Sequence, residues 1–240
     1  MNTYQQLSHE HAPQPILDAR DVQVPADGWR PAVTLDVQVY PGELHLVSSR
    51  DTLRSAALAD ALLGIAIPAQ GSVHFLGADW QHSPSEARLS LRRSIGRVPG
   101  RGAWMSTHSV MDNILLPQRH HTLLPEHALR SAATELARRF GLPGLPMQRP
   151  DACNDADLRR AACIRAFLGR PTLVVLEHPV SAVDTDLLTP LVGAVQQLRR
   201  RRGAVVWITG HDALLNDAAI PADRRHRLVG GDLLAWEKQR

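Results

Sequence analysis

Cysteine and aromatic residues are scarce in this chain of 240 residues. It contains two cysteines, Cys153 and Cys163, and aromatic side chains make up 4% of the sequence. Two cysteines ten positions apart, with no second pair, fit neither a disulfide framework nor a zinc site, so we expect a reducing compartment. The length excludes a small disulfide-stabilised scaffold and suits one large domain with a substantial core.

Long apolar runs are also missing. The longest, residues 56–67, is too short to cross a bilayer and contains Asp60. The first 13 residues have no apolar centre of the kind that a signal peptide needs. We therefore expect a soluble chain whose association with a membrane comes through a partner.

Lysine is nearly absent, so the net charge of +3 comes almost entirely from arginine. The four arginines at 199–202 are a candidate patch for nucleic acid or anionic lipid. However, they end a predicted helix, whose C-terminal dipole favours cations, and Gly203 follows as a stop signal. We favour a solvated helix end and expect no nucleic-acid partner. Two histidine pairs are candidate metal ligands: His9 with His11 in a polar tail, and His120 with His121 on a predicted loop. Neither pair has a third ligand nearby in the sequence, so we expect no metal site there.

One apolar segment gives the clearest positive signal. Residues 173–176 are four branched apolar residues, which suit a strand buried on both faces of a parallel sheet. Glu177 and His178 follow directly, at the carboxyl end where open α/β sheets collect ligands. They are candidates for holding a nucleotide and its metal, or they form the polar exit of an ordinary core strand.

Alternation of apolar residues and turn signals predict an α/β fold after a flexible arm at residues 1–15. Strands are predicted at 16–24, 33–39, 44–47, 71–77, 94–98, 173–176 and 204–208. Helices are predicted at 54–63, 84–93, 155–168 and 187–202, with a helical block at 109–139 that is broken at Pro117 and Pro125. A hairpin is predicted to join 227–229 to 233–235.

The connection between strand 44–47 and helix 54–63 has the place of a phosphate-binding loop but not its composition. A strand, a short loop and a helix early in a parallel sheet form the usual context of such a loop. Phosphate binding there needs glycines whose N–H groups converge, a lysine, and a hydroxyl for magnesium. The residues present, which include no glycine or lysine, are Ser49, Arg50, Asp51, Thr52, Leu53, Arg54, Ser55 and Ala56.

In this order the elements resemble the nucleotide-binding subunits of ABC transporters over residues 16–236, by spacing more than by motif identity. With the turn at 41–43 placed before the phosphate loop, the Walker A lysine falls on Ser55 and the magnesium-binding hydroxyl on Ala56. Gly100 takes the place of the Q-loop glutamine, and residues 153–157 take the place of the LSGGQ signature. The resemblance makes candidate nucleotide contacts of Ser49, Arg50, Thr52, Arg54, Ser55, Ala56, Gly100, Asn154, Asp155, Asp157 and Asp184.

The catalytic positions of the family are partly changed. Glu177 stands at the Walker B aspartate, which implies a magnesium ligand, and His178 stands at the catalytic glutamate. The D-loop at 181–184, with Asp184, and the switch histidine, His211, stand as the family has them. The resemblance therefore implies catalytic roles for Glu177, His178 and His211.

Within the family, residues 111–114, 121–125 and 159–162 look most like ATPases of Mla-type, MCE-associated phospholipid transport systems. The resemblance implies a P-loop NTPase-like ABC ATPase domain at 16–240, with a parallel core sheet, an antiparallel β subdomain and a helical subdomain at about 101–165. It implies a membrane permease, a homo- or heterodimer with another ABC ATPase subunit, and for the Mla type an MCE-domain protein as partners. It places the chain in the cytoplasm, peripheral on the inner face of the cytoplasmic membrane.

The changed positions lead us to expect weak or absent binding of ATP and Mg²⁺. Loss of a general base alone costs ~10²–10⁴ in rate, although Glu177 could still hold magnesium and Arg50 or Arg54 could place a guanidinium near a phosphate. Three hypotheses stay open: a structural or regulatory subunit with hydrolysis impaired or lost, an active but atypical ATPase that powers transport, and a soluble ABC-fold regulator. We favour the first because so many motif positions change together.

Overall fold

A computed structural model describes residues 14–100, 103–180 and 185–236. Most of the predicted N-terminal arm, with His9 and His11, lies outside these ranges. So does the segment that contains Asp184. No helix within the described ranges has the length and apolar character that a membrane crossing requires.

The centre of the sheet is parallel, as the apolar strands predict. β3 (Leu44–Ser48), β6 (Ile95–Val98), β7 (Leu173–Glu177) and β8 (Ala204–Thr209) pair in the order β3-β8-β7-β6. Every residue of β3, β7 and β8 is buried, which is typical of strands covered on both faces. Because these strands are parallel, their carboxyl ends meet at one edge of the sheet.

The rest of the sheet is largely antiparallel. β1 (Leu17–Val24), β2 (Val33–Val39), β4 (Gln70–Phe75) and β5 (Ala78–Asp79) pair in the order β5-β4-β1-β2. The predicted hairpin is confirmed as β9 (Arg224–Val229) and β10 (Asp232–Ala235), which connect β3 to β2. β9 begins earlier than predicted because its first residues pair with β3.

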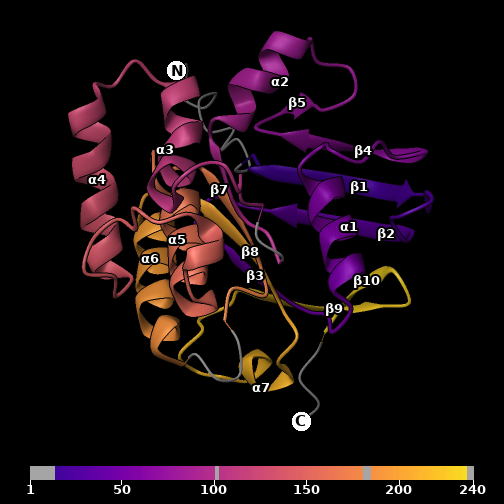
Figure 1. Ribbon diagram of the computed structural model, residues 1–240. Helices are drawn as coiled ribbons and strands as arrows, with labels where there is room; N and C mark the ends of the chain where they lie inside the picture. The colour runs from indigo at the N-terminus through magenta and orange to yellow at the C-terminus, as the bar shows by residue number, and fades with distance from the viewer. Residues whose placement is uncertain (1–13, 101–102, 181–184, 237–240) are drawn as a thin grey trace, which may run out of the picture.

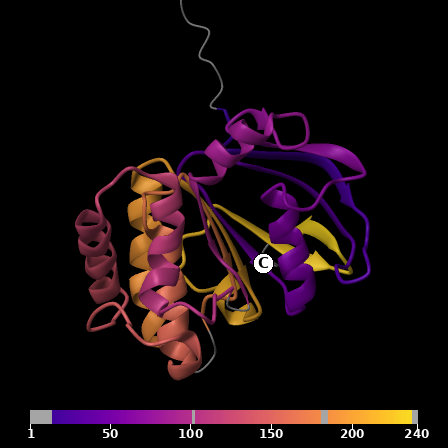
Figure 2. The same cartoon turned by 45° about the horizontal axis from the view of Figure 1, so that its top comes forward.

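Helices cover both faces of this sheet, and a hydrophobic cluster lies under each layer. Figures 1 and 2 show α1 (Thr52–Leu62) on one side. The other side carries α3 (Val110–His121), α4 (Glu126–Arg139), α5 (Asp155–Phe167) and α6 (Leu188–Arg200). The two remaining helices, α2 (Ser85–Arg92) and α7 (Asp212–Leu215), lie at the periphery (Figure 1). The arrangement is the α/β fold that the sequence predicted, with a parallel core sheet, an antiparallel part and a helical layer.

The prediction for α3 was wrong at Pro117. The helix passes through this proline and ends at His121. Ile114 and Leu115, just before the proline, are fully buried, so packing outweighs the missing proline N–H. As a result, the two adjacent histidines at 120 and 121 lie on the last turn of α3 rather than on a loop. The predicted break at Pro125 is confirmed, since α4 begins at the next residue.

The arginines at 199–202 end a helix as predicted. α6 finishes at Arg200, and Arg199 donates a hydrogen bond from Nε to the carbonyl oxygen of Gly42 at 2.6 Å. Nη2 of Arg199 also pairs with Oδ2 of Asp223 at 2.7 Å. Arg199 thus ties the helix end to the turn before β3, which is a structural role.

Candidate functional site

Asp51 occupies the N-terminal end of α1, the helix after the predicted phosphate loop. Its Oδ1 accepts hydrogen bonds from the backbone N–H groups of Leu53 and Arg54 at 2.9 and 3.0 Å. Its Oδ2 accepts a further bond from Nη1 of Arg54 at 2.8 Å. A helix N-terminus attracts anions through its free N–H groups and its dipole. Here the carboxylate of the chain itself fills that position, and α1 begins at Thr52, two residues earlier than predicted.

Ser55, predicted to take the position of the Walker A lysine, bonds to His178, predicted to take that of the catalytic glutamate. Ser55 is wholly buried, and its Oγ lies 2.9 Å from Nε2 of His178. The same hydroxyl lies 2.8 Å from the carbonyl oxygen of Asp51 and 2.9 Å from Oγ of Ser49. Because a carbonyl only accepts, Ser55 donates to Asp51 and is then free to accept from an Nε2–H of His178.

The surroundings of His178 keep its imidazole neutral. Burial lowers the pKa of His178, and the nearby His211 lowers it further. The backbone of His178 has a φ of 48°, in the left-handed region that non-glycine residues rarely adopt. This conformation follows directly after β7 and is stabilised by a hydrogen bond from its N–H to the carbonyl oxygen of Ile208 at 2.8 Å.

Glu177, predicted to take the Walker B position, is paired with an arginine. It is 2% exposed, and its Oε1 lies 2.6 Å from Nε of Arg97 on β6. Nη1 of Arg97 also pairs with Oδ1 of Asp60 at 2.8 Å, and Oδ2 of Asp60 lies 3.3 Å from Nη2 of Arg30. Burial raises the pKa of Glu177, and the bond with Arg97 opposes that rise. Oε2 accepts a long bond from the N–H of Gly100 at 3.5 Å, so both carboxyl oxygens have protein partners.

A cavity of about 600 Å³ lies beside these contacts. Arg50, near its edge, pairs with Asp212 at 2.6 Å. Asp212 also accepts a bond from Oγ of Ser48 at 2.7 Å, and these two contacts lower its pKa, the one with Ser48 more strongly. Six of the predicted site residues come together around the cavity: Arg50, Thr52, Gly100, Asp155, His178 and His211.

The other predicted nucleotide contacts among the described residues do not line this cavity. Asn154 caps α5, since its Oδ1 accepts a bond from the N–H of Asp157 at 2.8 Å and its Nδ2 donates to Oδ2 of Asp157 at 2.9 Å. These two side chains therefore serve the start of the helix. Ser49, Arg54, Ser55 and Ala56 lie in the loop and the first turns of α1.

Sequence reasoning missed the roles of Arg97 and Asp60. In the sequence, Asp60 only marks an interruption of the apolar run at 56–67, and Arg97 is one residue of a short strand. The available signal was a charged residue in each of two mainly apolar elements, because buried charges are almost always paired. The sequence does not identify the partner of either charge.

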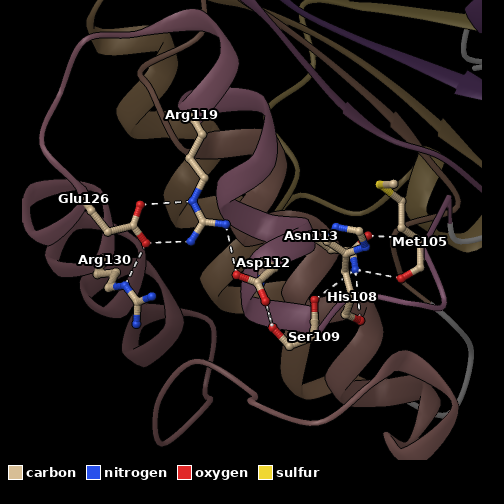
Figure 3. Close-up of polar contacts among 8 residues, drawn as sticks. All are labelled: Met105, His108, Ser109, Asp112, Asn113, Arg119, Glu126 and Arg130. Carbon is tan, nitrogen blue, oxygen red and sulfur yellow. Dashed lines mark hydrogen bonds and ion pairs between the residues drawn. The ribbon is translucent and has the colours of Figure 1, made fainter.

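Asn113 fixes the segment after Gly100 onto α3 (Figure 3). Asn113 is 3% exposed. Its Nδ2 donates to the carbonyl oxygens of Met105 and Ser109 at 3.1 and 2.9 Å. Its Oδ1 accepts a hydrogen bond from the N–H of Met105 at 2.8 Å. This segment forms one wall of a groove with a volume of about 350 Å³ between β6, α3, α5 and the end of α2. The groove is lined in part by Arg92, Arg93, Met105, Asn113, Pro117, His121 and Arg165.

We expect Arg97→Met to lower the free energy of unfolding by about 3 kcal/mol, because it leaves the buried carboxylate of Glu177 without its cation and leaves Asp60 with Arg30 alone. The double variant Arg97→Met/Glu177→Gln should recover part of this loss. Denaturant unfolding followed by circular dichroism measures both. Arg130→Met, which removes an exposed ion pair with Glu126, is the control and should change stability little. A loss for Arg97→Met no larger than that of the control would contradict the prediction.

No family model matches the chain. Individual known proteins and solved structures are similar to it. The nickel import ATP-binding protein NikE of Pseudomonas putida is 32% identical over 193 residues, which cover 78% of this chain and 70% of that protein. The intermembrane phospholipid transport system ATP-binding protein MlaF of Haemophilus influenzae is 25% identical over 178 residues, covering 74% and 67%. A solved ATP-binding cassette dimer in a post-hydrolysis state superposes with a TM-score of 0.76 at 17% identity, covering 90% of this chain and 96% of that one. The chain belongs to the family of ABC transporter ATP-binding proteins.

Proposed function

We propose that this chain is a structural or regulatory ATP-binding-cassette subunit of a membrane transport complex, in which ATP hydrolysis is impaired or lost. The observation that carries the proposal is the 2.9 Å contact between Oγ of Ser55 and Nε2 of His178. In the family, these two positions hold the lysine that binds phosphate and the glutamate that activates water. Here they bond to each other.

Two further contacts make Mg-ATP a poor fit to the site. The carboxylate of Asp51 occupies the N-terminus of α1, where a phosphate would otherwise bind. Its negative charge would repel that phosphate. Arg97 forms an ion pair with the carboxylate of Glu177, the group that would face the metal. In addition, a loop without glycine cannot bring several backbone N–H groups together around phosphates.

His178 is a weak substitute for a catalytic carboxylate. In the tautomer whose Nε2–H donates to Ser55, only Nδ1 can accept a proton from water. Its lowered pKa makes the ring a weaker base still. Loss of a general base costs ~10²–10⁴ in rate even when the nucleotide binds normally.

Pairing with an intact cassette subunit would not repair either site of a dimer. In the family, each ATP lies between the phosphate loop of one subunit and the signature of the other. This chain would give one site a loop without glycine or lysine, and it would give the other the altered segment 153–157. In that segment Asn154 and Asp157 already bond to each other.

A surface for a partner is retained. The groove beside α3 is held in shape by the buried Asn113, and Met105 is exposed at its wall. A packed groove of this kind needs no catalysis, so a chain can lose its phosphate loop and keep its docking surface. We propose that a permease docks through the helical subdomain, at about 101–165. The similarity to MlaF supports a lipid as the transported molecule, and an MCE-domain protein as a further partner.

An active but atypical ATPase is the alternative. One observation favours it: His211, at the position of the switch histidine, lines the same cavity as His178.

The purified chain is expected to show no ATP turnover, because the positions for phosphate, metal and base are each taken by an internal contact. Steady-state phosphate release measures this, with Glu177→Gln as the matched variant, which should be indistinguishable from the parent. A kcat of ~1–10³ s⁻¹, the usual enzyme range, that Glu177→Gln abolishes would establish the alternative.

The chain is expected to co-purify from membranes with its permease when the two are co-expressed. Met105→Glu should release it, because a charge is placed in the groove, whereas Leu234→Glu, on the distant β10 and similarly exposed, should not. Recovery of the unaltered chain as a cytosolic monomer in the presence of the permease would show that docking is wrong and would favour a soluble regulator.

A further inference from the structure

The connection between α3 and α4 carries two exposed leucines at the edge of the molecule. Leu123 is fully exposed and Leu124 is 55% exposed. Figure 1 shows the end of α3, this connection and the start of α4 at the same edge as α2. Single exposed apolar residues are common, but two consecutive ones on an outer connection form a projecting apolar tip.

The base of this tip is fixed by an ion-pair network (Figure 3). Nε and Nη2 of Arg119, on α3, bond to the two carboxyl oxygens of Glu126, the first residue of α4, at 3.0 and 2.6 Å. Arg119 also reaches Asp112 at 2.9 Å, and Arg130 reaches Glu126 at 2.8 Å. Bonds from Arg119 and Arg130 lower the pKa of Glu126 to about 2, so the pair stays ionised at neutral pH. The leucines therefore project from a braced connection.

The neighbouring helix α2 presents an apolar residue with two arginines. Leu89, Arg92 and Arg93 stand at i, i+3 and i+4, so they share one face of the helix, and Leu89 is 56% exposed. The guanidinium of Arg92 donates to the carbonyl oxygen of Gly64, and that of Arg93 to Ser90. Within the described part of the chain, neither arginine pairs with a carboxylate, so both charges are uncompensated.

The tip and the arginine face adjoin. Arg93 and His121, two residues before Leu123, line the same groove. Burial lowers the pKa of His121, and the nearby Arg93 and His120 lower it further, which is consistent with a positive potential between α2 and α3. We define the α2–α3 edge by five residues: Leu89, Arg92, Arg93, Leu123 and Leu124.

We propose that the α2–α3 edge rests directly on an anionic lipid bilayer, with the leucines in the boundary between headgroups and acyl chains and the arginines at lipid phosphates. Interfacial binding combines apolar burial with attraction to anionic lipid, and this edge supplies both. The leucines project outward, so a protein partner would need a matching pocket, whereas a bilayer accepts a projecting side chain without one. This contact goes beyond permease docking, and the two surfaces share Arg92 and Arg93, which also line the groove beside α3. It also departs from the expectation that the membrane is reached only through a partner.

Sedimentation of the purified full chain with vesicles tests the proposal. We expect binding to vesicles of phosphatidylglycerol and phosphatidylethanolamine, little binding to pure phosphatidylcholine, and weakening with salt. Leu123→Ser/Leu124→Ser should weaken binding by roughly tenfold or more. Arg92→Gln/Arg93→Gln should remove the preference for anionic lipid. The matched control is Val229→Ser/Leu234→Ser, two similarly exposed apolar residues of the β9–β10 hairpin, which should bind like the parent. Thermal melts confirm that each variant folds.

Equal binding to both lipids, no binding to either, or an equal loss in the control would overturn the proposal. These vesicles hold no permease, so the outcome is separate from that of co-purification. If Leu123→Ser/Leu124→Ser binds vesicles normally but loses the permease in detergent, the edge is a protein contact and the bilayer proposal is wrong.

Discussion

The hydrogen bond between Ser55 and His178 joins the start of α1 to the end of β7, and the rest of the site is arranged around it. A buried polar group that loses its ligand is costly unless it finds another partner. Ser55 forms a hydrogen bond with His178, and the N-terminus of α1 donates to the carboxylate of Asp51. Glu177 forms an ion pair with Arg97. Each of these three groups is satisfied within the chain.

Satisfying the site internally leaves the fold intact. β3, β7 and β8 remain fully buried and parallel, because their packing depends on apolar side chains and not on a bound phosphate. The groove beside α3 depends on Asn113, which has no contact with the loop at 49–55 among the hydrogen bonds of the described residues. The chain could therefore lose the chemistry of its nucleotide site and still keep a surface for a partner.

Much of the fold could be predicted because it depends on local patterns. The run at 173–176 predicted a buried strand, and the glycines at 230 and 231 predicted the hairpin. The failures concern tertiary contacts. Pro117 stays within α3 because its neighbours are buried, which a local pattern does not contain. Arg97 meets Asp60 and Glu177 from 37 and 80 positions away, so the ion pairs that fill the metal position could not be predicted from either residue alone.

The central claim is that the side chains of the chain itself fill its nucleotide site. The most direct test is thermal unfolding of the purified protein with and without millimolar Mg-ATP. A ligand at 100 times its Kd adds ~2.7 kcal/mol to the free energy of unfolding. We expect no appreciable stabilisation, because binding would have to break the contacts of Asp51, Ser55 and Glu177. A stabilisation of that size at millimolar Mg-ATP would contradict the claim.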